Sequence, residues 1–563
     1  MKYRHLFIMF LLFLAHQATA QVPNWTWARG SRDPVGPSHT LAMSIAADNF
    51  GNEYITGGLE SNYNIVGADT FFKACGGFSD AFLVKYDAAG NVLWAKGMGG
   101  TNSGAEGYSV KTDLAGNVFI TGAFEHGTAI FGTDTLTNDS LYWDMFIAKF
   151  DPSGNALWAR KTTSPNLSVG YSVATDSLGN VYLVGMFAGA AVTIGSFTLT
   201  SDSPAYGKIF IVKYDPAGNV VWAQSPRGFP CNVWNIASDG RNIFVTGSFA
   251  TANIIFGTDT LHTDSARTGD ICVVKFDPSG AVLWAKSANG KQNDYANGLA
   301  TPVSDYLYVT GYFQSDTFRF GSVTLTSDSP GAQLPTMFLA KYSSLTGNVV
   351  WAVKPNSSWC MATGIATDMA GDPYVTGHFA SANAVFGSDT LFSMGSFVAK
   401  YDGSGNAIWA KGGGYFQRFS NAVALDPAGS IYLTGEFNGA SILVLGADTV
   451  HGSPAGGGDL FVAKLSDVTA TTGLSNVFKH QNDMAVFPVP NDGIMSVACA
   501  GSGYTAINIY DGLGRKIFTQ PLDPAIRNQV SKVNIGHVPK GIYLLQAISP
   551  EGAVNKQILI QSL

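Results

Sequence analysis

Apolar and polar residues alternate with a period of two along most of the chain, in short runs separated by Gly, Asp and Asn. Residues 171–185, YSVATDSLGNVYLVG, are typical: two stretches rich in β-branched and aromatic residues flank a D-x-x-G-N turn. This alternation predicts half-buried strands, and Asp and Gly at these turn positions favour bulged hairpins. The pattern therefore predicts an all-β fold built from hairpins. A calcium loop is the alternative for the turn, but the EF-hand spacing with its distal Glu is absent.

A block of about 64 residues is repeated. Each repeat contains a strand that ends in Lys and, nine or ten residues later, a Trp-Ala pair. The Trp residues are Trp27, Trp94, Trp158, Trp222, Trp284, Trp351 and Trp409. The Lys residues are Lys85, Lys149, Lys213, Lys275, Lys341, Lys400 and Lys464. The first Trp has no Lys strand before it, and the last Lys has no Trp after it.

These two unmatched pieces complement each other. An unpaired edge strand exposes backbone donors and acceptors and promotes aggregation. If the strand around Trp27 pairs with the strand around Lys464, the last blade is complete, and a seven-bladed β-propeller is closed. The repeated Trp residues are then expected to pack between neighbouring blades, and the Lys residues to have a structural role.

Two further motifs also occur seven times, a V-Y-x-T-G-x-F strand and, ten or eleven residues on, F-G-x-D-T-L or a variant. The second motif accounts for a period longer than the ~40–45 residues of a WD40 blade. The D-x-x-G-N-x-Y-x-T-G core, as at Asp176 to Gly185, resembles the SBBP-type β-propeller repeat of secreted bacterial proteins. The resemblance covers residues 22–467 and implies the fold, but it implies no activity.

The N-terminus has the features of a secretory signal peptide, predicted over residues 1–20. Lys2 and Arg4 precede the apolar stretch 6–15, which is too short to span a bilayer. An A-x-A motif follows and predicts cleavage between Ala20 and Gln21. No later run has the length of a transmembrane helix. An ordinary buried helix is the alternative.

The repeats end near residue 467, so the propeller is expected over residues 21–467 and a linker over 468–483. Strands and Gly turns over 484–563 predict a small β-sandwich. FPVPNDG, IYDGLGRKI and Gly541-Ile542-Tyr543 resemble the C-terminal sorting domain of the type IX secretion system of Bacteroidota. Val489 departs from that family, which has Asn there. The resemblance implies export through the periplasm and outer membrane, to the cell surface or the medium, with the secretion machinery as partner. An adhesive sandwich is the alternative.

Composition narrows the function. Of 563 residues, 46% are hydrophobic and 13% charged, and the net charge is −7. The apolar content excludes disorder, and the acidic balance offers no basic surface for nucleic acid. The five Cys residues form neither a disulfide framework nor a C-x-x-C pair, and Cys272 stands where other repeats have Phe. We expect no cofactor or bound metal, and a monomer.

One strand of each repeat combines a constant frame with one variable position. The frame is an aliphatic residue followed by Ala in six repeats, with Lys111 as the exception. Two residues before the aliphatic position the residue varies: Met43, Tyr108, Tyr171, Trp234, Asn297, Thr363 and Asn421. A constant frame with one variable ring is typical of a recognition surface, although drift between loops produces the same pattern.

The loops before this strand hold Arg and aromatic residues, which suit interfaces and sugar rings. The predicted ligand-binding residues are Arg32, Tyr108, Tyr171, Arg227, Trp234, Trp359 and Arg418. A set of solvated loops is the alternative.

No catalytic motif is present: there is no G-x-S-x-G, no H-E-x-x-H and no His spacing for a metal. We therefore predict a binding module for a glycan or a protein. Two alternatives stay open. One is a polysaccharide-degrading hydrolase or lyase, with carboxylates such as Glu106 and Asp294 brought together by the fold. The other is a structural scaffold.

Overall fold

The computed structural model describes residues 22–560, except 34–35, 37, 62, 68, 73–78, 101–103, 202–206, 229–230, 251, 264–267, 303–304, 393, 414–419, 439–440, 467–483, 488–493, 500–502, 512–514, 527–528, 536–537, 539–540 and 550–551. The predicted signal peptide with its cleavage site and the predicted linker lie outside this range. Every regular element in the described part is a β-strand, so the all-β prediction is confirmed. In the same residues no helix has the length and hydropathy needed to cross a bilayer.

Seven units of four antiparallel strands occupy residues 24–466. In each unit the first strand is the innermost and the last is the outermost. Blade 1 is β2 (Ser38–Ala47), β3 (Glu53–Leu59), β6 (Asp80–Tyr86) and β7 (Val92–Met98). Blade 2 is β8 (Ala105–Thr112), β9 (Val118–Phe124), β12 (Asp144–Phe150) and β13 (Ala156–Thr163). Blade 3 is β14 (Ser168–Thr175), β15 (Val181–Phe187), β18 (Lys208–Tyr214) and β19 (Val220–Gln224). Blade 4 is β21 (Cys231–Ser238), β22 (Ile243–Phe249), β25 (Asp270–Phe276) and β26 (Val282–Ala288).

The remaining three units follow the same plan. Blade 5 is β27 (Asp294–Ala300), β28 (Tyr306–Phe313), β31 (Thr336–Ser343) and β32 (Val349–Val353). Blade 6 is β33 (Cys360–Thr367), β34 (Pro373–Phe379), β37 (Gly395–Tyr401) and β38 (Ala407–Gly412). Blade 7 is β39 (Ser420–Leu425), β40 (Ile431–Asn438), β43 (Gly457–Ser466) and, from the other end of the chain, β1 (Asn24–Arg32).

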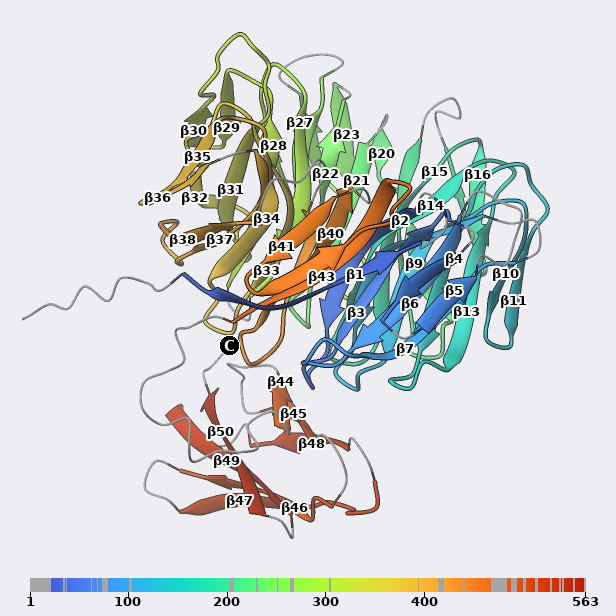
Figure 1. Ribbon diagram of the computed structural model, residues 1–563, viewed down its shortest axis with the longest axis vertical. Coiled ribbons are helices and arrows are strands. Elements are labelled where there is room, and N and C mark those ends of the chain that lie inside the picture. Colours follow the sequence, from blue (N-terminus) through green and yellow to red (C-terminus); the bar gives the residue numbers. More distant parts are fainter. Residues whose placement is uncertain are drawn as a thin grey trace, which may run out of the picture.

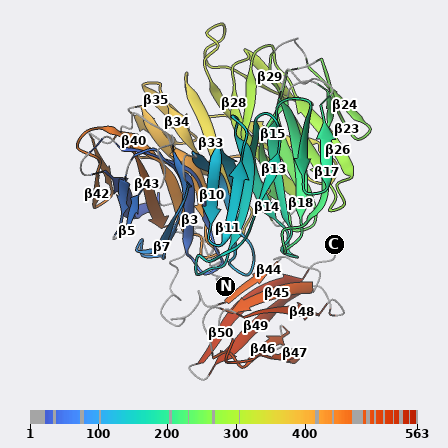
Figure 2. The ribbon, with the colours of Figure 1, turned by 90° about the vertical axis from the view of Figure 1, so that its right-hand side faces the viewer.

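The blades form a closed ring. Each innermost strand contacts the next, in the order β2, β8, β14, β21, β27, β33, β39 and back to β2. Blue, green, yellow and orange blades follow one another in chain order (Figure 1), and Figure 2 shows the ring from the side. β1 pairs antiparallel with β43, with Trp27 opposite Lys464 and Ala28 opposite Ala463. The propeller closed by its N-terminal strand is thus the observed architecture.

The F-G-x-D-T-L motif forms an extra hairpin at the outer rim of each blade. The hairpins are β4 (Tyr63–Val66) with β5 (Asp69–Phe72), β10 (Gly127–Phe131) with β11 (Asp134–Asn138), β16 (Ala191–Ile194) with β17 (Phe197–Thr200), β23 (Asn253–Phe256) with β24 (Asp259–His262), β29 (Thr317–Phe320) with β30 (Val323–Thr326), β35 (Asn383–Phe386) with β36 (Asp389–Phe392), and β41 (Ile442–Leu445) with β42 (Asp448–His451).

The Asp of this motif satisfies a backbone donor of the outermost strand. Asp134 Oδ2 accepts the amide of Ala159 at 2.9 Å, and Asp448 Oδ2 accepts that of Ala28 at 2.8 Å. Blades 4 and 6 have the same bond. Since an uncovered edge strand invites pairing with other chains, these hairpins protect the rim of the propeller.

The D-x-x-G-N turns are Asx-type turns. In the first, Asp48 Oδ1 accepts the amides of Phe50 and Asn52, and Asp48 Oδ2 accepts the Asn52 side chain at 2.8 Å. Gly51 has a φ of 78°, which suits glycine. Within the described residues, no three His, Cys, Asp or Glu side chains come together as a ligand set for a metal.

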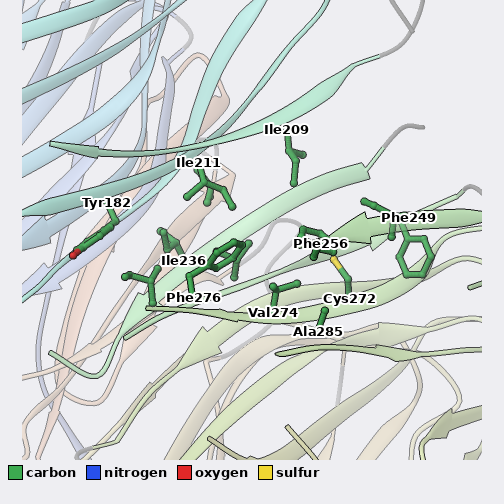
Figure 3. Close-up of a cluster of buried hydrophobic side chains, with 14 of the residues drawn as sticks. Tyr182, Ile209, Ile211, Ile236, Phe249, Phe256, Cys272, Val274, Phe276 and Ala285 are labelled. Carbon is green, nitrogen blue, oxygen red and sulfur yellow. The ribbon is translucent and has the colours of Figure 1, made fainter. Parts of the chain in front are cut away.

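Hydrophobic cores lie between successive blades. Figure 3 shows the one between blades 3 and 4, where Tyr182 and Ile211 meet Phe256, Val274 and Phe276. Cys272 is fully buried in the same cluster and takes the place that Phe has in other repeats.

The C-terminal unit has two sheets. β44 (Met484–Phe487), β45 (Ile494–Cys499) and β48 (Val530–Asn534) form one, and β46 (Ala506–Tyr510), β47 (Lys516–Pro521), β49 (Gly541–Ser549) and β50 (Gly552–Ile560) the other. Side chains of both sheets, such as Val497 and Ile509, share one buried cluster. This is the small sandwich that the sequence predicts, coloured red in Figure 1.

Candidate functional site

The innermost strand of every blade carries a β-bulge at one equivalent position. In blade 1, Ala42 lies opposite Gly57 and Ser44 opposite Thr56, so Met43 is the extra residue. The register shifts at the same place in the other six blades. The extra residues are Met43, Tyr108, Tyr171, Trp234, Asn297, Thr363 and Asn421. The variable ring of the sequence is therefore the ring of bulged residues, and bulges re-aim side chains beside functional sites.

The bulge explains the repeated Thr-Gly pair on the next strand. A Cβ at Gly57 would lie 1.7 Å from the carbonyl oxygen of Leu41, and one at Gly122 1.8 Å from that of Glu106. Only glycine permits this close approach of the bulged backbone. Thr56 and its equivalents donate their hydroxyl to a carbonyl of the third strand, at 2.7 Å from Phe82 O in blade 1.

At the bulge, one side-chain-to-backbone hydrogen bond joins each pair of neighbouring innermost strands. In blades 1 to 4 it is made by the residue after the bulge. The bonds are Val110 N to Ser44 Oγ at 3.2 Å, Val173 N to Ser109 Oγ at 3.3 Å, Ile236 N to Ser172 Oγ at 3.4 Å, and Asn235 Nδ2 to Asn297 O at 2.6 Å.

In blades 5 to 7 the bulged residue itself makes that bond. Asn297 Nδ2 donates to Ala362 O at 2.9 Å, Thr363 Oγ1 to Ser420 O at 2.6 Å, and Asn421 Nδ2 to Ala42 O at 2.6 Å. The residue after the bulge is then Gly298, Gly364 or Ala422, none of which can form a side-chain hydrogen bond. We call Asn297, Thr363 and Asn421 the stitched arc.

In blades 1 to 4 the residue after the bulge makes the hydrogen bond between the innermost strands. The bulged residues of these blades are large: Met43, Tyr108, Tyr171 and Trp234. We call them the open arc. Met43, Tyr108 and Tyr171 are partly exposed. Tyr108 and Tyr171 come from adjacent blades, and their ring centroids lie 6.3 Å apart with an angle of 43° between the ring planes. For Trp234 the structure describes the backbone bulge but not the side chain.

A carboxylate is attached to the open arc. The Tyr108 hydroxyl donates to Glu106 Oε2 at 2.6 Å, and Ser79 Oγ donates to Glu106 Oε1 at 3.3 Å. Burial, with the nearby Glu106 charge, raises the pKa of Tyr108, and burial raises that of Tyr171. Both phenols therefore stay neutral, and the cluster offers ring faces with a fixed acceptor beside them.

The other predicted ligand-binding residues lie elsewhere. Arg32 and Arg227 are exposed at the outer rim, where Arg32 pairs with Ile65 of β4 and Arg227, in β20 (Arg227–Gly228), pairs with Ile255 of β23. Trp359 packs against His378, with ring centroids 5.2 Å apart. Burial lowers the pKa of His378 to about 4. Arg418 lies outside the described residues.

The two carboxylates considered for catalysis are far apart in the ring. Glu106 belongs to blade 2, and Asp294 belongs to blade 5. Asp294 is fully buried, where it accepts hydrogen bonds from the Gln314 amide and the Ser315 hydroxyl, each at 3.0 Å. Burial raises its pKa to about 8. It holds a loop of blade 5 and does not form an acid/base pair with Glu106.

The repeated Trp and Lys residues join the outer parts of the blades. The Trp158 indole donates to Pro216 O at 3.1 Å, and the Lys149 ammonium donates to the same carbonyl at 3.3 Å. The same pair of bonds reaches the next blade's turn from Trp27, Trp94, Trp222, Trp284 and Trp351 and their Lys partners.

Trp409 is the exception, because its indole nitrogen is buried with no partner in the described structure. Lys400 instead pairs with Asp368 at 3.2 Å. The turn that would accept both bonds would join β43 to β1, and these strands come from opposite ends of the chain.

Comparison with known proteins assigns the C-terminal unit. Residues 485–561 match the family model of the secretion system C-terminal sorting domain, which indicates export through the type IX secretion system to the cell surface or beyond. The chain is similar to two curated proteins. It is 25% identical over 460 residues to an uncharacterized WD repeat-containing protein of Acanthamoeba polyphaga mimivirus, covering 66% of this chain and 32% of that protein. It is 30% identical over 149 residues to the regulatory protein FlaEY of Caulobacter vibrioides, covering 25% of this chain and 15% of that protein.

Among solved structures, the Dos1 propeller aligns over 78% of this chain and 94% of its own length, with 9% identity and a TM-score of 0.37. The quinohemoprotein alcohol dehydrogenase ADHIIG from Pseudomonas putida HK5 aligns over 80% of this chain and 77% of its own, with 12% identity and a TM-score of 0.35. The chain spans about a third or less of the length of the curated relatives.

Proposed function

We propose that this protein is a binding module of the SBBP type, exported by a bacterium of the Bacteroidota, which holds a glycan on the open arc of its propeller. The observation that carries the proposal is the division of the bulged ring. In four adjacent blades the residue after the bulge makes the hydrogen bond to the neighbouring innermost strand. The bulged position of these blades holds a large residue: Met43, Tyr108, Tyr171 or Trp234.

The chemistry of the arc favours a sugar. Aromatic side chains bring large, rigid contact surfaces with polar tips, and sugar rings stack on such faces. The Tyr108–Glu106 pair adds an oriented carboxylate, which can accept hydrogen bonds from sugar hydroxyl groups. The sorting domain supports this by placing the propeller where extracellular glycans are met.

Two other functions receive less support. For a glycan-cleaving enzyme, two carboxylates ~5–10 Å apart would be expected, whereas Glu106 and Asp294 lie in blades 2 and 5. For a scaffold, nothing would favour a run of large bulged residues in four adjacent blades.

The test is glycan-array binding of the exported propeller, with the double variant Tyr108→Ala and Tyr171→Ala. We expect binding to a subset of glycans, weakened at least tenfold in the variant, since each lost aromatic contact contributes on the order of 1 kcal/mol or more. The matched control is Arg32→Gln with Arg227→Gln, which changes exposed side chains at the rim and should leave binding unchanged.

Each contrary result has a clear meaning. If no glycan binds and an extracellular protein is captured through the same residues, the ligand is a protein. If the rim variant abolishes binding and the tyrosine variant does not, the site lies at the rim and the proposal is wrong.

A further inference from the structure

Lys111 interrupts the most uniform column of the inner strands. The other six blades have Ala at this position: Ala46, Ala174, Ala237, Ala300, Ala366 and Ala424. Four of these are buried, among them Ala46 at 5% and Ala174 at 3% exposure. A lysine here is not required by the fold, because every other blade forms without one.

The Lys111 side chain is exposed although it belongs to β8, the innermost strand of its blade. The two residues before it, Ser109 and Val110, are buried. β8 is flanked by the innermost strands β2 and β14, so protein surrounds the lysine on the sides away from the axis. The exposed side chain therefore belongs to the inner edge of blade 2, beside the axis of the ring.

This ammonium has no counter-ion in the described structure. Neither a hydrogen bond nor an ion pair to a described residue is formed by it. The flanking strands β9 and β14 carry no charged residue, and β2 carries only His39, near its opposite end. β3 and β6 also contact β8 and carry Glu53, Asp80 and Lys85, none of which is bonded to Lys111 in the described structure. Although the side chain is exposed, the protein around it excludes part of its hydration, and this desolvation lowers the pKa of Lys111 with no carboxylate opposing the shift.

The polar neighbours are already engaged. Thr112 Oγ1 donates to Ala47 O at 2.9 Å, and Thr175 Oγ1 donates to Thr112 O at 3.1 Å. An ammonium group has three donors and no acceptor, and a partly desolvated charge without a partner is unfavourable. An anion in the axis would remove that cost.

We propose that Lys111 makes the axis of the propeller a binding site for a carboxylate or sulfate group. Lys111 follows Tyr108 by three residues on the same strand, about 10 Å at the usual rise. If the open arc binds a glycan, which rests on the function proposed above, a disaccharide seated there can place an acidic end group at Lys111. Glu106, on the other side of Tyr108, disfavours further acidic groups at the arc itself.

The first experiment asks whether the site exists. Amine acylation of the propeller at pH 8, quantified by peptide mass spectrometry, is run with sodium sulfate and with sodium chloride at equal ionic strength. We expect sulfate to slow acylation of Lys111 severalfold while Lys96 and Lys286, on outermost strands, are unaffected. Equal slowing of all three, or none, would overturn the proposal.

The effect of sulfate on the melting temperature of a matched variant tests the same anion site. Lys111→Ala restores the residue of the other six blades and is expected to fold. Since a ligand that binds only the folded state raises its melting temperature, sulfate should stabilise the wild type more than the variant. An identical sulfate effect on both proteins would contradict an anion site at Lys111.

The second experiment identifies the source of the anion. Lactobionate, a disaccharide with a terminal carboxylate, is compared with neutral lactose in the acylation assay, in the wild type and in Tyr108→Ala. Protection by lactobionate that weakens in Tyr108→Ala assigns the acidic group to a saccharide on the open arc. Protection by sulfate that is unchanged in Tyr108→Ala assigns the site to a free anion, which supports Lys111 even if the glycan proposal fails.

Discussion

The stitched arc and the open arc have the same β-bulge but differ in which residue forms the hydrogen bond to the neighbouring innermost strand. In blades 5 to 7 the bulged residue bonds to the next blade, as Asn421 does to Ala42 O. In blades 1 to 4 that task has moved by one residue, as at Ser109, and Tyr108 is left with its ring partly exposed. Because each pair of neighbouring innermost strands has this bond at the bulge only once, a shift of the bonding side chain by one residue leaves the bulged position available to a ligand.

The largest expected effect concerns the closure on which both arcs depend. Deleting residues 22–32 removes β1, its pairing with β43 and the buried Trp27. Loss of a buried Trp alone costs ~3–5 kcal/mol, so we expect a strong fall in melting temperature, measured by differential scanning fluorimetry. Trp27→Ala, which keeps the strand, should give a smaller fall. A deletion variant that melts like the wild type would contradict closure by β1.

The next effect separates the arcs directly. Asn421→Ala leaves the buried carbonyl of Ala42 without its donor and should lower stability by ~1–3 kcal/mol without changing ligand affinity. Tyr108→Phe keeps the ring and removes only the hydroxyl bonded to Glu106, so its stability loss should be ~1 kcal/mol or less. Chemical denaturation of the two variants measures the difference. Equal stability losses, with equal loss of binding, would remove the distinction between the arcs.

A pH effect is expected at the seam between blades 7 and 1. Glu53 is fully buried where other blades have an aliphatic residue such as Val118 or Val181. Burial raises its pKa to about 9, although the nearby Tyr432 hydroxyl and Lys464 oppose the shift.

The sign follows from the proton balance. Between the unfolded pKa near 4.5 and the folded value near 9, the folded protein holds a proton that the unfolded chain has lost. Stability therefore falls as pH rises through that window, by on the order of 1–3 kcal/mol from pH 5.5 to 7.5. Glu53→Val should flatten the profile and stabilise the protein at pH 7.5. An unchanged profile would show that Glu53 is not the group responsible.

The smallest effect tests the seam between blades 6 and 7. Trp158→Phe loses the bond to Pro216 O, whereas Trp409→Phe loses none in the described structure. The two substitutions remove the same volume, so Trp158→Phe should be more destabilising by about 1 kcal/mol. Equal values from denaturant titration would indicate that the indole bonds contribute little.

Much of the fold could be predicted from the sequence because the residues that recur in every repeat have direct structural roles. Asp48 and Gly51 specify the turn, and the unmatched Trp27 and Lys464 reveal the closure. The site could be read only in part. Arg32 follows Trp-Ala like a loop residue, yet the outermost strand continues to it and keeps it at the rim.

The division of the ring also could not be read from the variable position alone. Trp234 and Asn297 occupy the same position of the repeat. The hydrogen bonds show that the following residue decides whether the bulged residue binds the next blade, because Asn235 makes that bond in blade 4 and Asn297 itself makes it in blade 5. The signal is present in the next column, where Ser44, Ser109, Ser172 and Asn235 give way to Gly298, Gly364 and Ala422. This change from Ser or Asn to Gly or Ala can be interpreted only once the hydrogen bonds between the innermost strands are known.

The most direct test converts one blade of the open arc into the stitched pattern. The double variant Tyr108→Asn with Ser109→Gly gives blade 2 the Asn-Gly pair that blade 5 has at Asn297 and Gly298, and the introduced amide should reach the carbonyl of Gly170. We predict a melting temperature close to that of the wild type together with loss of glycan binding on the array. Binding that survives unchanged, or a fall in stability as large as that from deleting β1, would contradict the account.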